Sequence, residues 1–61
     1  MMKNHYGYQV NNGDGQEIIA DTEKAALRAI REEYGDDANI TIDLLGKIDP
    51  DHWSNEHIWN V

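Results

Sequence analysis

The side chains best suited to bind a metal ion or to transfer a proton lie near the C-terminus, at Asp51, His52, Glu56 and His57. The two histidines are five positions apart and, in a chain without cysteine, they form no standard zinc motif. We therefore expect both histidines to lie on the surface. We expect neither a metal site nor any other cofactor.

Catalysis by a nucleophile requires a neighbouring base, an orienting group and a pocket. The chain has no cysteine and a single serine, Ser54, and its 61 residues leave little material for a water-excluding pocket. His5 stands alone among polar neighbours and receives no role. These observations predict that the protein is not an enzyme.

The segment Asn11–Gly15 has the composition of a calcium-binding loop. If either glycine took the sixth position of such a loop, Val10 or Tyr8 would occupy the first ligand position, where an acidic residue is required. The same glycines precede no helix and no lysine, so they do not form a phosphate-binding loop. Asn-Gly and Asp-Gly pairs are instead typical of tight hairpin turns.

Charge is distributed unevenly along the chain. Residues 1–31 are formally neutral, whereas residues 32–61 carry the whole net charge of −7. Phosphate groups attract Lys and Arg, so this balance argues against direct binding to nucleic acid or to an anionic membrane. It favours a protein partner with a basic surface. The candidate binding residues are the acids of this half and one terminal tryptophan: Glu32, Glu33, Asp36, Asp37, Asp43, Asp49, Asp51, Glu56 and Trp59.

Two strands and a helix are expected to hold these residues in place. Alternation from His5 to Asn11 predicts a half-buried strand, and the turn after it predicts a hairpin with Gln16–Ala20 as its partner. The period then changes to three or four residues. Asp21 or Thr22 can cap the start of a helix, and Gly35 can end it in the left-handed conformation.

A third strand is expected at residues 40–45, followed by a turn at Gly46–Asp51. Pro50 suits the first position of a short helical segment there. Residues 57–61 are expected to form a fourth strand or a tail. The fold class is therefore α+β, a small two-layer α/β sandwich of one domain over residues 1–61. The expected core is Tyr6, Tyr8, Val10, Ile18, Ala20, Leu27, Ile30, Tyr34, Ile40, Ile42 and Leu44.

In size and charge, but in no motif, the chain resembles the small acidic inhibitors that phages and other mobile elements make against nucleic-acid-directed defence systems, including anti-restriction and anti-CRISPR proteins. The resemblance implies a protein that blocks a basic surface, as a nucleic-acid mimic does. The lack of cysteine, and the lack of an apolar segment after Met1, Met2, Lys3 and Asn4, predict a cytoplasmic protein. The alternative is an assembly module that forms a homodimer or packs on an apolar partner. It would use Ile19 and Leu45 on the second sheet face together with the C-terminal aromatic residues.

Overall fold

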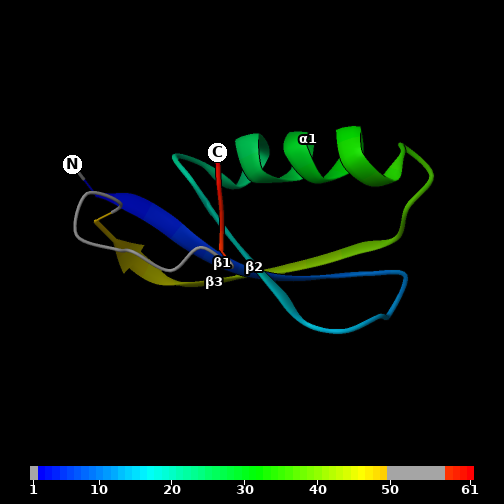
Figure 1. Ribbon diagram of the computed structural model, residues 1–61, viewed down its shortest axis with the longest axis horizontal. Coiled ribbons are helices and arrows are strands. Elements are labelled where there is room, and N and C mark those ends of the chain that lie inside the picture. The colour runs from blue at the N-terminus through cyan, green and yellow to red at the C-terminus, as the bar shows by residue number, and fades with distance from the viewer. Residues whose placement is uncertain (1, 50–57) are drawn as a thin grey trace.

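The computed structural model describes residues 2–49 and 58–61. One helix packs on a four-stranded sheet (Figure 1), which confirms the predicted fold class. The predicted short helical segment at residues 50–54 lies outside the described residues. In chain order the elements are β1 (Lys3–Val10), β2 (Gln16–Ala20), α1 (Glu23–Tyr34), β3 (Ile40–Ile48) and β4 (Trp59–Asn60).

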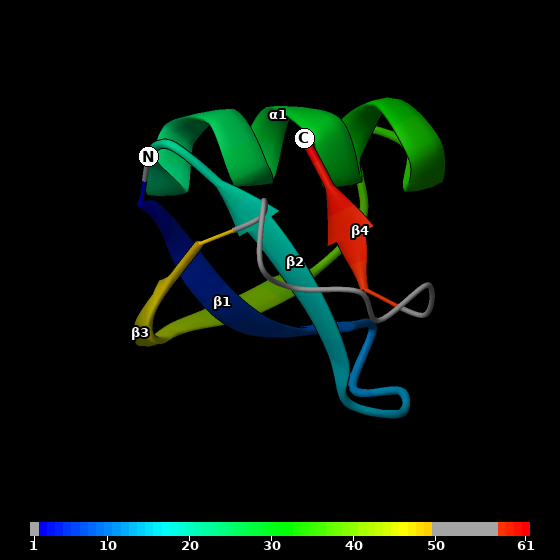
Figure 2. The same ribbon diagram turned by 60° about the vertical axis from the view of Figure 1, so that its left-hand side comes forward.

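The order of the strands in the sheet is β3-β1-β2-β4. The central strand β1 pairs antiparallel with both β2 and β3, and the fourth strand pairs parallel with β2. Figure 2 shows β4 beside β2, with the C-terminus reaching toward α1. Two strands that are consecutive in sequence order, β3 and β4, therefore form the opposite edges of the sheet.

The hairpin between β1 and β2 turns at asparagines. Asn11 and Asn12 have φ angles of 53° and 59°, and the amide of Gly13 donates to the carbonyl oxygen of Val10 at 2.9 Å. Two consecutive residues with positive φ angles are typical of the type I′ turn. Its twist matches the twist of the two strands that it joins. The predicted turn is present, but asparagine and not glycine supplies the positive φ angles, because short polar side chains also tolerate that conformation.

The ends of α1 follow the sequence closely. The Thr22 hydroxyl accepts a hydrogen bond from the amide of Ala25 at 3.1 Å, as an N-cap residue does. Gly35 has a φ of 99°, and its amide donates to the carbonyl oxygen of Arg31 at 2.7 Å. These two residues fix where α1 begins and ends.

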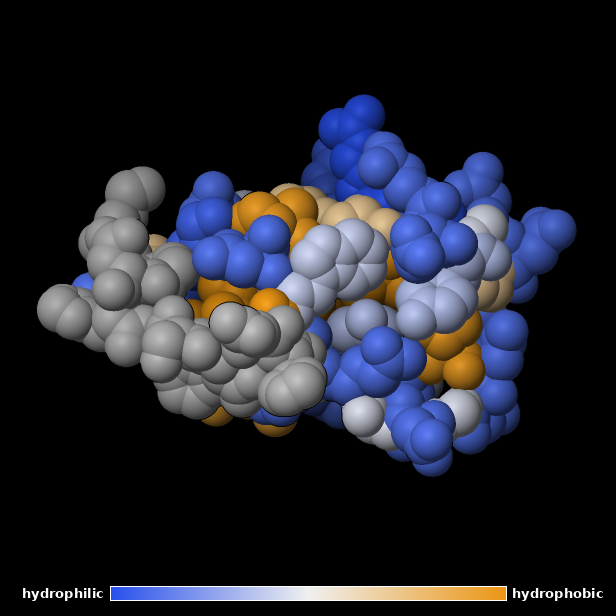
Figure 3. Space-filling view, viewed as in Figure 1, coloured by the Kyte–Doolittle hydropathy of each residue, from blue (hydrophilic) through white to orange (hydrophobic). Residues whose placement is uncertain are grey.

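The core lies between α1 and the sheet. Its buried residues are Tyr6, Tyr8, Ile18, Ala20, Ala26 and Ile30, and Val10, Ala25, Ala29, Ile40 and Ile42 pack against them. Small alanines on α1 therefore pack with two large tyrosines of β1. On the face shown in Figure 3, hydrophilic side chains cover the outer side of the helix, and apolar surface shows between helix and strands.

Three residues expected in the core lie outside it. Leu27 is only half-buried and lines a groove on the outer side of α1, while Tyr34 is 45% exposed. Only one side of an amphipathic helix faces the core. In α1 that side carries the alanines and Ile30, so Leu27 and Tyr34 lie outside it. Leu44 is 60% exposed. Of the apolar residues of β3, only Ile40 and Ile42 pack against the buried core.

The turn expected at Gly46 is also wrong, because β3 continues through it to Ile48. The pairing with β1 shifts between His5 and Tyr6, whose partners are Gly46 and Leu44, so Leu45 is an extra residue in a β-bulge. Gly46 has a φ of 154°, a conformation that other residues rarely adopt. A bulge keeps the strand paired while it changes direction.

Candidate functional site

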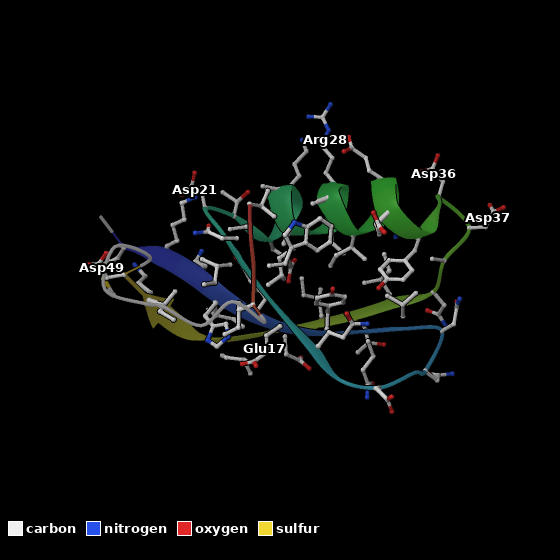
Figure 4. All side chains as sticks on the ribbon, in the orientation of Figure 1. Glu17, Asp21, Arg28, Asp36, Asp37 and Asp49 are labelled. Atoms are coloured by element: carbon white, nitrogen blue, oxygen red, sulfur yellow. The ribbon has the colours of Figure 1, made fainter. Side chains whose placement is uncertain are left out.

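The predicted acidic residues do not gather on one surface. Asp36 and Asp37 follow α1 at one end of the molecule, and Asp49 lies at the other end (Figure 4). The nine residues of β3 separate them, a span of about 30 Å at 3.3 Å per residue. The longest dimension of the molecule is 34 Å. The acids therefore follow the length of one strand.

Asp43 is exposed at the middle of that strand, on the sheet face opposite α1. It is the register partner of Gly7, whose other partner is Glu17 on β2. The side chain of Leu45 lies over Gly7 on the same face, 3.3 Å from where a β-carbon would stand. His5 was given no role from the sequence, but its Nε2 atom lies 2.9 Å from Oε1 of Glu17.

The second sheet face offers less apolar surface than the sequence suggested. Ile19 pairs with His5 on that face, as expected, but it is only 1% exposed, and Ile58 is also buried. Leu45 is 57% exposed. A partner that docks on this face could therefore contact Leu45 but not Ile19.

We use the term acidic edge for the side of β3 that faces away from β1, from Ile40 to Leu45, together with Asp36 and Asp37. Within the described residues, no strand pairs with this side of β3. Residues 36–45 contain three carboxylates and no basic side chain. The edge also carries Leu44 and Leu45, the two most exposed large apolar residues among those described.

The spacing along the acidic edge differs from that of a nucleic acid. Asp37 and Asp43 are separated by six positions, or about 20 Å of extended chain. Double-stranded DNA carries one charge per about 1.7 Å of its axis. The acidic edge is thus a backbone edge with a few carboxylates and has no array of charges at phosphate spacing.

A second site lies where the end of α1 meets the start of β2 and β4. We call it the tyrosine groove, an open cavity of about 610 Å³. It is lined by Tyr8, Gly15, Gln16, Glu17, Glu33, Tyr34 and Trp59. Glu33 and Trp59 were both predicted as binding residues, and the groove brings them together.

The tyrosines and Gln16 of this groove were missed in the sequence. The Tyr8 hydroxyl donates to Oε1 of Gln16 at 3.1 Å, and Nε2 of Gln16 donates to the Tyr34 hydroxyl at 3.4 Å. Burial raises the pKa of Tyr8, and the neighbouring Tyr34 hydroxyl and Glu33 carboxylate raise it further. Tyr8 is therefore a neutral hydrogen-bond donor at physiological pH.

The remaining candidates are dispersed. Glu32 is exposed on α1 outside the tyrosine groove, and Asp51 and Glu56 lie outside the described residues. In residues 2–49 and 58–61, no three His, Asp or Glu side chains are placed to hold a metal ion. No helix in this part of the chain is long and apolar enough to cross a membrane.

Comparisons with protein-family models, with curated proteins and with solved structures find no match to this chain. The two sites therefore rest on geometry and chemistry alone.

Proposed function

We propose that the protein is a non-catalytic binding module that captures a basic, extended segment of a partner protein along the acidic edge. The observation that carries the proposal is that β3, which bears Asp43, ends the sheet with one side unpaired among the described strands. Such a strand presents unpaired amide and carbonyl groups, and an extended peptide can add to it as a further strand.

The two faces of β3 specify the sequence of such a segment. Ile42 and Leu44 lie on the side of α1, and Thr41 and Asp43 lie on the opposite side, because their β1 partners alternate in the same way. An added strand continues this alternation. Its apolar residues would cover the exposed Leu44, and its basic residues would meet Asp43.

Charge favours a partner over a second copy of the chain. Each copy carries a net charge of −7, so two copies repel one another, whereas a basic segment is attracted. The bulge at Leu45 and the nearby Lys47 also limit pairing of two β3 edges, since bulges and lysines are common protections of edge strands. The inhibitor class named from the sequence is a special case of this proposal, and the homodimer is its alternative.

The test is calorimetric titration with a peptide of about eight alternating Lys and Val residues. We expect binding that weakens as salt is raised, because exposed charge pairs are screened. A peptide with the same composition but with the lysines and valines in two blocks should bind at least about tenfold more weakly. Methylation of alternate peptide amides retains the charge and removes backbone donors, so it should abolish binding.

Asp43→Asn should weaken binding of the alternating peptide by about two- to fivefold, the effect of one exposed ion pair. Asp14→Asn is the matched control, because it removes the same charge from the exposed hairpin turn and should change nothing. Equal binding of the methylated peptide would show that only bulk charge attracts the ligand, and the proposal would fail. Sedimentation that shows a stable dimer of the free protein would contradict it in favour of the homodimer.

A further inference from the structure

The tyrosine groove combines features that the acidic edge lacks. Tyr8, Tyr34 and Trp59 line it together with the carboxylates of Glu33 and Glu17, and no Lys or Arg contributes to its lining. Tyr34 and Trp59 are 45% and 36% exposed. Two large aromatic side chains are thus left partly in water at the rim of a negatively charged cavity.

A groove on the outer side of α1 has a similar volume, about 630 Å³, but a different character. Lys24, Arg28 and Arg31 line it with Glu32 and Asp36, so charges of both signs are present, and no aromatic side chain among the described residues contributes. Arg28 points away from the sheet in Figure 4. Such a mixture of charges is typical of a solvated helix face.

Aromatic rings attract cations through the negative charge on their faces, and the attraction is strongest for weakly hydrated ions such as quaternary ammonium. The hydrogen bonds from Tyr8 to Gln16 and from Gln16 to Tyr34 link two of the three aromatic residues before any ligand arrives. Because less ordering is then needed on binding, affinity is gained. The volume of the groove lies within the range of known small-molecule sites.

We propose that the tyrosine groove binds a methylated ammonium group, with Tyr34 and Trp59 as its aromatic walls and Glu33 as its counter-charge, while the buried Tyr8 holds Tyr34 in place through Gln16. Among the described residues, none that lines the groove belongs to β3, so this proposal does not rest on the proposed function. A methylated lysine side chain and choline share this chemistry.

The test is an NMR titration with choline, observed at the indole N–H of Trp59. The matched control ligand is 3,3-dimethylbutan-1-ol, which has the shape of choline without its charge. We expect choline to bind about two- to fivefold more tightly than the alcohol, the effect of a cation–π contact at an exposed site. Equal binding of the two, or no shift with choline, would overturn the proposal.

Paired variants locate the site. Glu33→Gln should weaken choline binding by about two- to fivefold, whereas Glu32→Gln, which removes the same charge from the neighbouring position outside the groove, should have no effect. Equal effects of the two variants would overturn the assignment of Glu33. Trp59→Leu should abolish binding, and its circular dichroism spectrum checks that the fold is retained.

The source of the ammonium group is decided by a short peptide that carries trimethyllysine. Tighter binding of this peptide than of choline identifies a modified protein as the ligand, and the reverse order identifies a small molecule. Either order supports the groove as a methylammonium site. Equal binding of the peptide with unmodified lysine would contradict it, because a strongly hydrated ammonium gains less from aromatic walls.

Discussion

The acidic edge and the tyrosine groove use acidic residues in different ways. At the acidic edge, carboxylates follow a strand at wide intervals, beside exposed leucines and a backbone that pairs with no further described strand. In the tyrosine groove, Glu33 lies among three aromatic residues that border a cavity. The first arrangement suits an extended partner, and the second suits a single cationic group. Net charge alone does not distinguish these two uses, because it says nothing about what surrounds each carboxylate.

The two regions also differ in the burial of their apolar side chains. Ile18 is fully buried beneath α1, whereas Leu45 is 57% exposed. We expect Ile18→Ala to lower the free energy of unfolding by about 2–5 kcal/mol, enough to unfold much of a domain this small. Leu45→Ala should cost less than about 1 kcal/mol. Urea denaturation measures both, and similar losses would contradict the difference between the two regions.

The β-bulge, at the end of the acidic edge, is expected to make the next largest contribution to stability. At Gly46, where φ is 154°, alanine would meet no atom within 4 Å but would be strained. We expect Gly46→Ala to lower the free energy of unfolding by about 1–3 kcal/mol. Gly15→Ala is the control, since Gly15 has an open surrounding and no positive φ. Equal melting temperatures of the two variants would show that the bulge does not require glycine at position 46.

Tyr8→Phe tests the groove with a smaller effect. It removes the hydrogen bond to Gln16 and should cost about 1 kcal/mol at neutral pH. The raised pKa of Tyr8 means that the unfolded chain loses this proton at a lower pH than the folded chain does. The contribution of the neutral Tyr8 side chain to the stability of the fold is therefore complete below about pH 10. It is lost as the pH rises through the pKa of Tyr8 in the folded protein.

The measurement is urea unfolding of both proteins between neutral pH and about pH 11. The wild type should lose more stability than Tyr8→Phe over the alkaline part of this range. A parallel decline in both proteins would show that Tyr8 is not the group that titrates. Tyr6→Phe is a suitable control, because Tyr6 is equally buried at 4% exposed but lies outside the groove.

Local sequence patterns predicted much of the fold. The cap at Thr22, the stop at Gly35 and the alternation of Tyr6 and Tyr8 depend on neighbours within a few residues, and the structure confirms all of them. The bulge at Leu45 and the exposure of Leu44 could not be predicted in this way. They depend on how β3 is aligned with β1, more than thirty positions earlier in the chain.

The candidate sites were predicted only in part. Glu33 and Trp59 were selected for charge and for aromatic character, and they meet in one groove. Gln16 could not be selected from the sequence. It bridges the hydroxyl groups of Tyr8 and Tyr34, which only the fold brings together. The separation of Asp36 from Asp49 follows from the direction of β3, which composition does not specify.

The central claim, that the acidic edge captures an extended basic segment, is tested most directly by amide hydrogen exchange of the isotope-labelled protein with and without the alternating peptide. New hydrogen bonds to an added strand should slow the exchange of those amides of residues 40–44 that are not bonded to β1. The same amides should be unaffected by choline. Unchanged exchange in β3 at saturating peptide, or protection confined to the tyrosine groove, would contradict the account.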